Sequence, residues 1–127
     1  MEYVTLNNGV SVPRSAFGIF KIPKEDTVRA VLDAIEVGYR HFDTAQSYMN
    51  EEELGTAIRQ SGIPRKEFFI TTKVWLEHFG EGKTEKSLER SLKRLQTDYI
   101  RSRSPASALT IFTGLGEIWK RCTKRTP

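Results

Sequence analysis

Short apolar and β-branched runs, the pattern of β-strands, recur along residues 1–100 of this 127-residue chain. The first two runs flank Asn7-Asn8-Gly9, and Asn-Gly between β-prone segments favours a hairpin. The run Phe68–Thr72 is almost wholly apolar and β-branched, as in a strand covered on both faces. The predicted strands are Tyr3–Leu6, Val10–Val12, Ala16–Phe20, Tyr39–Asp43 and Phe68–Thr72, with Tyr99-Ile100 as the start of a further one.

Amphipathic helices are predicted in the intervals between these strands. The segment Val28–Ile35 repeats apolar residues at the i, i+3, i+4, i+7 spacing of one helix face. Asp26 or Thr27 can cap the start of this helix, and Gly38 suits its end.

Two further helices are predicted, each with a candidate capping residue at its start. Asn50 with Glu53 three residues later is a variant of the capping box, which predicts a helix from there to about Gln60. Thr84 can cap a third helix. The leucines of that helix share one face, at Leu88, Leu92 and Leu95.

The order of elements after the hairpin is β-α-β-α-β-α-β, with short connections. This alternation predicts an α/β fold with a parallel sheet and right-handed crossovers. The pattern alone leaves open a (β/α)₈ barrel and a doubly wound sheet. No G-x-G-x-x-G follows the first strand of the sheet, which disfavours a dinucleotide-binding doubly wound fold.

The net charge of +4 is unevenly distributed along the chain. Residues 1–100 hold 14 Lys and Arg against 15 Asp and Glu, whereas residues 101–127 hold 6 basic residues and one acidic residue. A basic tail can bind nucleic acid, but this one has no stacking platform or known motif. We therefore expect no nucleic-acid partner.

Composition narrows the cellular setting. No apolar run approaches the roughly 20 residues of a membrane helix, and the N-terminus lacks the profile of a signal peptide. The single cysteine, Cys122, excludes an intramolecular disulfide framework. We expect a cytoplasmic protein with no membrane association. No Cys/His cluster has metal-ligand spacing, so no metal site is expected.

Three ionisable residues follow strand-like runs: Asp43, Tyr48 and Lys73. Catalytic groups gather at the C-terminal ends of parallel strands, so the three would meet at one rim. A free tyrosine has a pKa of roughly 10, and a nearby ammonium favours the phenolate. Such a set could protonate a carbonyl oxygen while hydride reaches the carbon. Equally, each residue alone could be a cap, an aromatic at the surface or a surface charge.

The two histidines lie at His41 and His78. His41, on a predicted strand, is interpreted as a core histidine or one satisfied by a hydrogen-bond partner, rather than a base. His78, in a predicted loop, fits a pocket role and a surface role equally well. Glu51, Glu52 and Glu53 favour a helix N-terminus.

Residues 1–100 resemble the aldo-keto reductases, NADPH-dependent (β/α)₈-barrel enzymes that reduce aldehydes and ketones. The segment GYRHFDTAQSYMNEEELG matches the first signature of that family, FITTKVW its lysine-bearing strand, and SLKRLQTDYI the entry to its fourth strand. The resemblance implies the N-terminal part of a TIM barrel with an N-terminal β-hairpin that closes the barrel bottom, truncated after about the fourth strand.

Site residues are carried over position by position from this resemblance. It implies Tyr48 as the general acid, Lys73 as the cation that tunes it, and Asp43 as the partner of Lys73 near the nicotinamide ribose of NADPH. Phe20 and Trp75 would line the pocket of a small carbonyl substrate. No histidine occurs after His78, so the family's carbonyl-orienting histidine has no counterpart.

The resemblance stops after Ile100, which divides the chain into an incomplete barrel domain, 1–100, and a basic tail, 101–127. For the segment TGLGEIWKRCTKRT, one choice of synonymous codons spells YGAWRDMEEMYKED in an overlapping frame. That string resembles the family's helix after the fourth strand. We hypothesise that the tail is frameshifted translation, and sequencing the gene would refute this if the other frame does not encode that helix.

Two functions therefore remain for the chain. The first is an aldo-keto reductase that reduces carbonyls to alcohols with Tyr48 as proton donor. The second is a truncated, inactive fragment of such an enzyme, at most a partner-binding piece. A closed barrel takes about 250 residues, and three or four strands leave sheet edges exposed. For the fragment we expect self-association through those edges.

Overall fold

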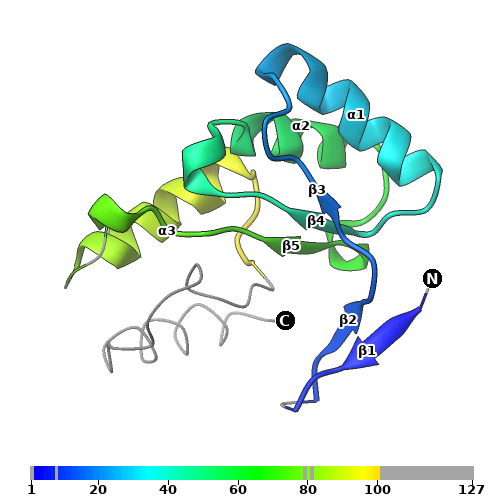
Figure 1. Cartoon of the computed structure of the whole chain (residues 1–127), viewed down its shortest axis with the longest axis horizontal. Coiled ribbons are helices and arrows are strands. Elements are labelled where there is room, and N and C mark those ends of the chain that lie inside the picture. The colour runs from blue at the N-terminus through cyan, green and yellow to red at the C-terminus, as the bar shows by residue number, and fades with distance from the viewer. Residues whose placement is uncertain (1, 8, 79, 81, 101–127) are drawn as a thin grey trace.

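The computed structural model describes residues 2–100 except residues 8, 79 and 81. This part of the chain forms a β-hairpin and a parallel sheet whose helices lie on one face (Figure 1). The predicted frameshifted tail, residues 101–127, lies outside the described residues. So does any continuation of the predicted fourth strand.

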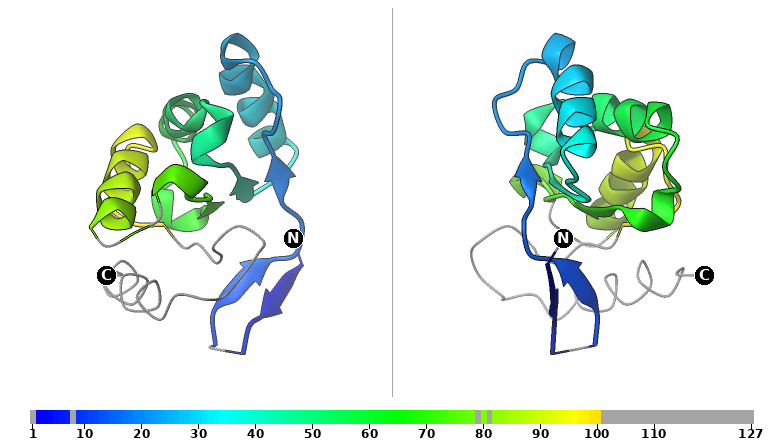
Figure 2. Two further views of the ribbon diagram at one scale, coloured as in Figure 1. Left: turned by 60° about the vertical axis from the view of Figure 1, so that its left-hand side comes forward. Right: turned by 90° about the vertical axis from the view of Figure 1, so that its right-hand side faces the viewer.

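The hairpin consists of β1 (Tyr3–Thr5) and β2 (Ser11–Pro13), which pair antiparallel with Val4 opposite Val12. Gly9 has a φ of +80°, which suits glycine in the connecting turn. The predicted hairpin is confirmed. It projects away from the helices, beyond the end of the parallel sheet at which β3 begins (Figure 2).

The parallel sheet contains β3 (Phe17–Gly18), β4 (His41–Asp43) and β5 (Phe69–Thr71), in that order. Phe42 lies opposite Phe17 on one side and Ile70 on the other. Each strand pairs with its neighbour in sequence, and the described strands advance in one direction only. The predicted α/β organisation is confirmed, and this winding is the one that a (β/α)₈ barrel requires.

The helices are α1 (Lys24–Glu36), α2 (Glu51–Gln60) and α3 (Lys83–Arg94). In Figure 1, α1 and α2 lie over the same face of the sheet. Apolar side chains from the strands and helices meet in the layer between them, as binary patterning predicts. The largest buried members of this core are Ile19, Val31, Phe42, Leu54, Phe68 and Ile70.

The predicted cap of α1 is wrong. The helix begins earlier, at Lys24 after Pro23, whose φ of −58° is already close to the helical value. Thr27 therefore lies inside the first turn, where its hydroxyl donates to the Pro23 carbonyl at 2.8 Å. Gly38 ends this segment with a φ of +104°, as predicted.

The predicted caps of α2 and α3 are also wrong. Asn50 precedes α2, but its side chain makes no capping hydrogen bond. Glu53 pairs with Lys24 at 3.8 Å and so does not complete a capping box. Helix α3 begins after Gly82, and the Thr84 hydroxyl donates to the His78 carbonyl at 3.0 Å.

Helix α3 faces the rest of the molecule mainly through hydroxyl side chains. Of the leucines predicted to share one face, Leu95 is buried, whereas Leu88 and Leu92 are half-buried. The fully buried positions within the helix are Thr84, Ser87 and Ser91. The leucine spacing therefore identified the helix but not the face that packs.

Helices α2 and α3 approach each other closely at Gly55. A Cβ atom at this position would lie 2.7 Å from the carbonyl carbon and oxygen of Leu95 and 2.8 Å from the Arg94 oxygen. Glycine is thus required there by the neighbouring backbone. Beyond α3 the chain reaches the buried Tyr99, but no strand forms at the predicted Tyr99-Ile100 within the described residues.

Short 3₁₀ turns complete the described elements: η1 (Gln46–Tyr48), η2 (Arg65–Glu67) and η3 (Leu76–His78). None of the helices in the described part of the chain has the length and apolar character needed to cross a bilayer.

Candidate active site

The three ionisable residues predicted to meet lie together at one end of the parallel sheet. Asp43 is the last residue of β4, Tyr48 is the last residue of η1, and Lys73 lies just beyond β5. Lys73 Nζ donates to Asp43 Oδ2 at 2.5 Å and to the Thr44 carbonyl at 3.3 Å. The same ammonium lies 5.5 Å from the centroid of the Tyr48 ring.

Parallel pairing explains this arrangement. Asp43 lies opposite Thr71, and the hydrogen bonding continues past the strand ends. The Thr44 N–H donates to the Thr71 carbonyl at 2.8 Å, and the Gln46 N–H donates to the Lys73 carbonyl at 3.1 Å. The backbone thus places the two segments side by side before any side chain contributes.

The ion pair remains partly open to solvent. The side chains of Lys73 and Asp43 are 30% and 32% exposed. At that exposure the pair adds little stability, so its position at the strand ends matters more than its energy. The exposed part of the carboxylate leaves room for a further hydrogen-bond donor.

The aromatic ring of Phe20 packs against Tyr48, beside the Lys73–Asp43 ion pair. The rings of Phe20 and Tyr48 lie 4.9 Å apart between centroids, and Phe20 is 59% exposed. The residues that follow these rings, Lys21 and Met49, have φ values of +61° and +58°. Left-handed conformations of this kind are costly outside glycine and are found at functional sites.

Trp75, the other predicted pocket residue, is 43% exposed on the loop after β5. The structure thus brings Phe20 to Tyr48, but the ring contacts of the described chain include none from Trp75 to either residue. Its described hydrogen bond is made by the backbone, whose N–H donates to Gln46 Oε1 at 2.9 Å.

The loop that carries Phe20 is held by the side chain of Asn50. Asn50 Nδ2 donates to the carbonyls of Ile19 and Ile22, at 3.0 and 3.3 Å. Its Oδ1 accepts from the Thr44 hydroxyl at 3.3 Å. These contacts explain why the side chain does not cap α2.

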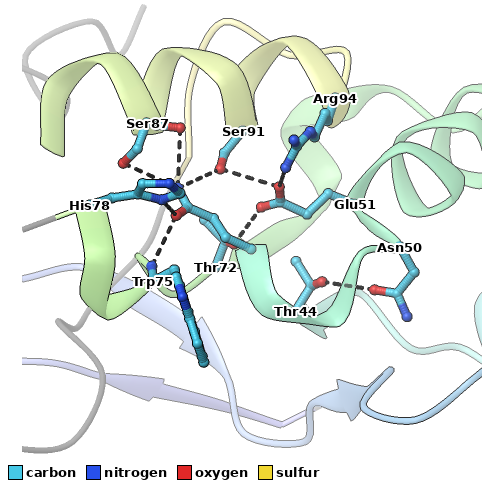
Figure 3. A network of polar contacts seen from close by, with 10 residues as sticks. Thr44, Asn50, Glu51, Thr72, Trp75, His78, Ser87, Ser91 and Arg94 are labelled. Carbon is cyan, nitrogen blue, oxygen red and sulfur yellow. Dashed lines mark hydrogen bonds and ion pairs between the residues drawn. The ribbon is translucent and has the colours of Figure 1, made fainter. Parts of the chain in front are cut away.

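Sequence reasoning missed a buried polar network that joins the site loops to α3 (Figure 3). Glu51 is only 1% exposed, and its carboxylate accepts from the hydroxyls of Thr72 at 2.7 Å and Ser91 at 3.2 Å. A guanidinium nitrogen of Arg94 lies 3.5 Å from Glu51 Oε2. Thr72 immediately precedes Lys73, so this carboxylate helps to fix the strand end that presents the lysine.

Gln46 is the second member of the network that was missed. Its side chain is buried, and its amide contacts the loop after β5 as well as α3. The signal in the sequence was the stripe of small hydroxyl residues on α3. Such a stripe predicts polar packing only when its partner is known, and that partner lies some 40 residues earlier.

Both histidine rings make hydrogen-bonding contacts with other side chains. His41 Nε2 lies 2.9 Å from the Thr71 hydroxyl, and Nδ1 lies 3.3 Å from the Pro13 carbonyl. Burial lowers the pKa of His41 from its ordinary value of 6.5, against opposing effects of the Pro13 hydrogen bond and the Asp43 charge. The interpretation of His41 as a histidine with a hydrogen-bond partner is confirmed. His78 is half-buried, with Nδ1 3.0 Å from Gln46 Oε1.

The polar groups at the strand ends are candidates to hold a metal ion or a cofactor. No cluster of metal-ligating side chains occurs among residues 2–100 outside positions 8, 79 and 81. The Asp43 carboxylate is partly exposed, so it could accept a hydrogen bond from a ribose hydroxyl of a nicotinamide cofactor.

The model of the Aldo/keto reductase family matches residues 15–102. Glycerol 2-dehydrogenase (NADP(+)) of Saccharomyces cerevisiae is 44% identical over 99 residues, which are 78% of this chain and 31% of the yeast protein. This chain spans about a third of the length of the curated relatives that it matches.

Solved structures give the same result. The crystal structure of an aldo/keto reductase from Brucella melitensis superposes with a TM-score of 0.75 at 44% identity, over 78% of this chain and 39% of the other. A Bombyx mori aldo-keto reductase in complex with NADP gives a TM-score of 0.74 at 35% identity, over 78% and 36%.

Proposed function

Because this chain belongs to the aldo/keto reductase family, we propose that it carries the proton-donating part of an NADPH-dependent carbonyl reductase. The observation that supports this most directly is the set at the strand ends: Lys73 on Asp43 at 2.5 Å and over the Tyr48 ring at 5.5 Å. The part of this chain that superposes on the solved aldo-keto reductases covers a little over a third of the length of those chains.

The reaction would be the reduction of an aldehyde or ketone to an alcohol. When bound, the cofactor would supply a hydride for the carbonyl carbon, and the Tyr48 hydroxyl would give its proton to the carbonyl oxygen. Proton donation by a positioned side chain typically contributes about 10²–10⁴-fold to the rate. The Lys73 ammonium, held by Asp43, stabilises the negative charge that is left on the tyrosine oxygen.

NADPH is proposed as the hydride source. The similar yeast enzyme is an NADP(+) glycerol 2-dehydrogenase, and the similar Bombyx mori structure is a complex with NADP. In this chain Asp43 would hold the nicotinamide ribose through the part of its carboxylate that remains exposed. A cytoplasmic site of action, suggested by the single cysteine, stays a prediction.

The substrate would be a small molecule bound against apolar rings. Phe20 packs against Tyr48 and exposes more than half of its surface, and Trp75 is exposed on the adjacent loop. Exposed aromatic faces beside a few polar groups are typical of small-ligand sites. Phe20 and Trp75 are therefore proposed to contact the substrate.

A second candidate, an inactive fragment, is favoured by the sheet itself. Within the described residues β3 and β5 each pair on one side only, and the ion pair is about one third exposed. Catalysis of this type benefits from a site that excludes water. By itself the chain would then associate through its sheet edges rather than reduce carbonyls.

Two preparations distinguish these candidates. The chain alone is assayed for NADPH consumption with a nitrobenzaldehyde, and we expect negligible turnover. In a chimera, residues 1–100 replace the matching part of the yeast glycerol 2-dehydrogenase. We expect the chimera to reduce the aldehyde and Tyr48→Phe to lose at least about 10²-fold of that rate.

Each outcome has a defined meaning. Turnover by the chain alone that disappears in Tyr48→Phe would contradict the inactive fragment. A folded chimera whose rate is unaffected by Tyr48→Phe would refute the role of this tyrosine as proton donor. Tyr3→Phe, which removes the same hydroxyl from a ring that is 58% exposed on β1, serves as the matched control.

A further inference from the structure

The side chain of Gln46 joins three segments that are distant in sequence. It is 5% exposed, and both ends of its amide are engaged. Oε1 accepts from the Trp75 N–H at 2.9 Å and lies 3.0 Å from His78 Nδ1. Nε2 donates to the Ser87 carbonyl at 3.1 Å and to the Ser91 hydroxyl at 3.0 Å.

These partners determine the orientation of the amide. A backbone N–H can only donate, and a backbone carbonyl can only accept. Oε1 must therefore face Trp75, and Nε2 must face Ser87. Because Oε1 is an acceptor, the His78 nitrogen that points at it carries a proton, so the ring is the Nδ1–H tautomer or the imidazolium.

The hydroxyls on α3 are oriented to receive the amide. Ser87 Oγ donates to the Thr84 carbonyl at 2.9 Å, and Ser91 Oγ donates to Glu51 Oε2 at 3.2 Å. Each hydroxyl has one proton, so both oxygens are left as acceptors on the side of Gln46. Every group in this buried network has a complementary partner, and such networks rigidify the elements that they join.

The position of Gln46 in the chain gives this network a functional meaning. Gln46 opens the single turn η1 that Tyr48 closes. One end of η1 therefore carries the proposed acid, and the other end holds the loop that carries Trp75. Figure 3 shows the Trp75 indole extending away from α3, on the opposite side from Ser87 and Ser91.

We propose that Gln46 is a positioning residue that fixes the orientation of Trp75 relative to Tyr48. It does so by clamping the Trp75 backbone and the His78 ring against α3. This inference deepens the proposed function, since it gives Trp75 its place in the substrate pocket. It concerns the geometry of the pocket wall and assigns Gln46 no contact with substrate or cofactor.

Tryptophan fluorescence tests the proposal without any need for turnover. The chain has two tryptophans, Trp75 and Trp119, so Trp119→Phe leaves Trp75 as the only emitter. In that background Gln46→Met keeps the length of the side chain but removes every hydrogen bond of the amide. We expect a red-shifted emission and stronger quenching by acrylamide, with an unchanged far-UV circular dichroism spectrum.

The matched control is Gln96→Met. Gln96 also uses its amide, donating to Thr56 Oγ1 at 3.1 Å, but on the exposed surface between α2 and the end of α3. This variant should leave the Trp75 emission unchanged. Equal emission and equal quenching in Gln46→Met and in the Trp119→Phe background would overturn the proposal.

A second variant, Gln46→Glu, covers the case in which Gln46→Met does not fold. An ionised carboxylate keeps the acceptor for Trp75 but cannot donate to the Ser87 carbonyl, and Ser91 then lies between it and Glu51. The protonated form restores a donor, and a neighbouring carboxylate favours protonation. The Trp75 emission should therefore return towards the parent spectrum on acidification.

The same titration of the Trp119→Phe background corrects for the other charged groups near the amide, Glu51, His78 and Arg94. Emission of Gln46→Glu that tracks the background at every pH would overturn the proposal. In the active chimera, Gln46→Met should raise KM for the aldehyde more than it lowers kcat. A chimera without turnover would refute the proposed function and leave the fluorescence result standing.

Discussion

Replacing Gly55 by alanine tests the close approach of α2 and α3. The added Cβ would lie 2.7 Å from two backbone atoms of Leu95, whereas ordinary contacts begin at 3.4 Å. The shortfall is about 0.7 Å by that difference. Because the obstacle is the backbone at the end of α3, no rotation of a side chain can relieve it.

Two opposing effects set the size of the change. Alanine is favoured over glycine within a helix by about 1 kcal/mol. Overpacking of a well-packed contact costs about 1–3 kcal/mol, and a backbone obstacle places Gly55→Ala near the upper limit. We therefore expect the free energy of unfolding to fall by about 2 kcal/mol.

Urea denaturation followed by far-UV circular dichroism measures this change. Gly18→Ala is the matched control, because no atom lies within 4 Å of a Cβ built there and its φ is not left-handed. That variant should be as stable as the parent chain or slightly more stable. A Gly55→Ala chain of equal or greater stability than the parent would show that α2 and α3 do not pack as closely as described.

Three further predictions use the same denaturation assay. Burial lowers the pKa of His41 below 6.5, so the unfolded state binds more protons than the folded state as the pH drops through that value. The free energy of unfolding should therefore fall as the pH drops through 6.5, and His41→Asn should flatten that part of its pH profile. Glu51→Ala removes the carboxylate that accepts from the buried hydroxyls of Thr72 and Ser91, and it should cost about 2 kcal/mol. Glu52→Ala, at the exposed neighbouring position, should change stability by less than about 0.5 kcal/mol; equal costs would contradict the buried network. Met49→Gly relieves a left-handed φ of +58° at a side chain that is 61% exposed, and a gain of about 0.5 kcal/mol is expected; a clear loss would mean that the Met49 side chain makes a stabilising contact.

Hydrophobic patterning located the strands of the sheet, α1 and α3, because it reports which residues must be buried, whereas α2 was located through a capping box that does not form. The patterning could not identify the caps. Thr27, Asn50 and Thr84 have the side chains of capping residues, but all three bind backbone carbonyls elsewhere. A short polar side chain serves either purpose, and the choice depends on which carbonyls the fold brings within reach.

Some residues of the candidate site could be predicted from the sequence pattern, and others could not. Asp43, Tyr48 and Lys73 could be brought together from the sequence because strand ends of a parallel sheet share an edge. Phe20 and Trp75 depended on the family resemblance. The buried roles of Gln46 and Glu51 could not be predicted because partners of both lie on α3, and nothing local distinguishes the two residues from polar residues at a surface.

The amide of Asn50 has an evolutionary consequence. It binds the carbonyls on both sides of the loop that carries Phe20, so the path of that loop is set by a residue other than the one that protrudes from it. Mutations at position 20 can therefore change the shape of the proposed substrate site while the loop keeps its course. In the proposed reductase, selection for a new substrate could then proceed through this ring alone, with the proposed proton donor Tyr48 left in place.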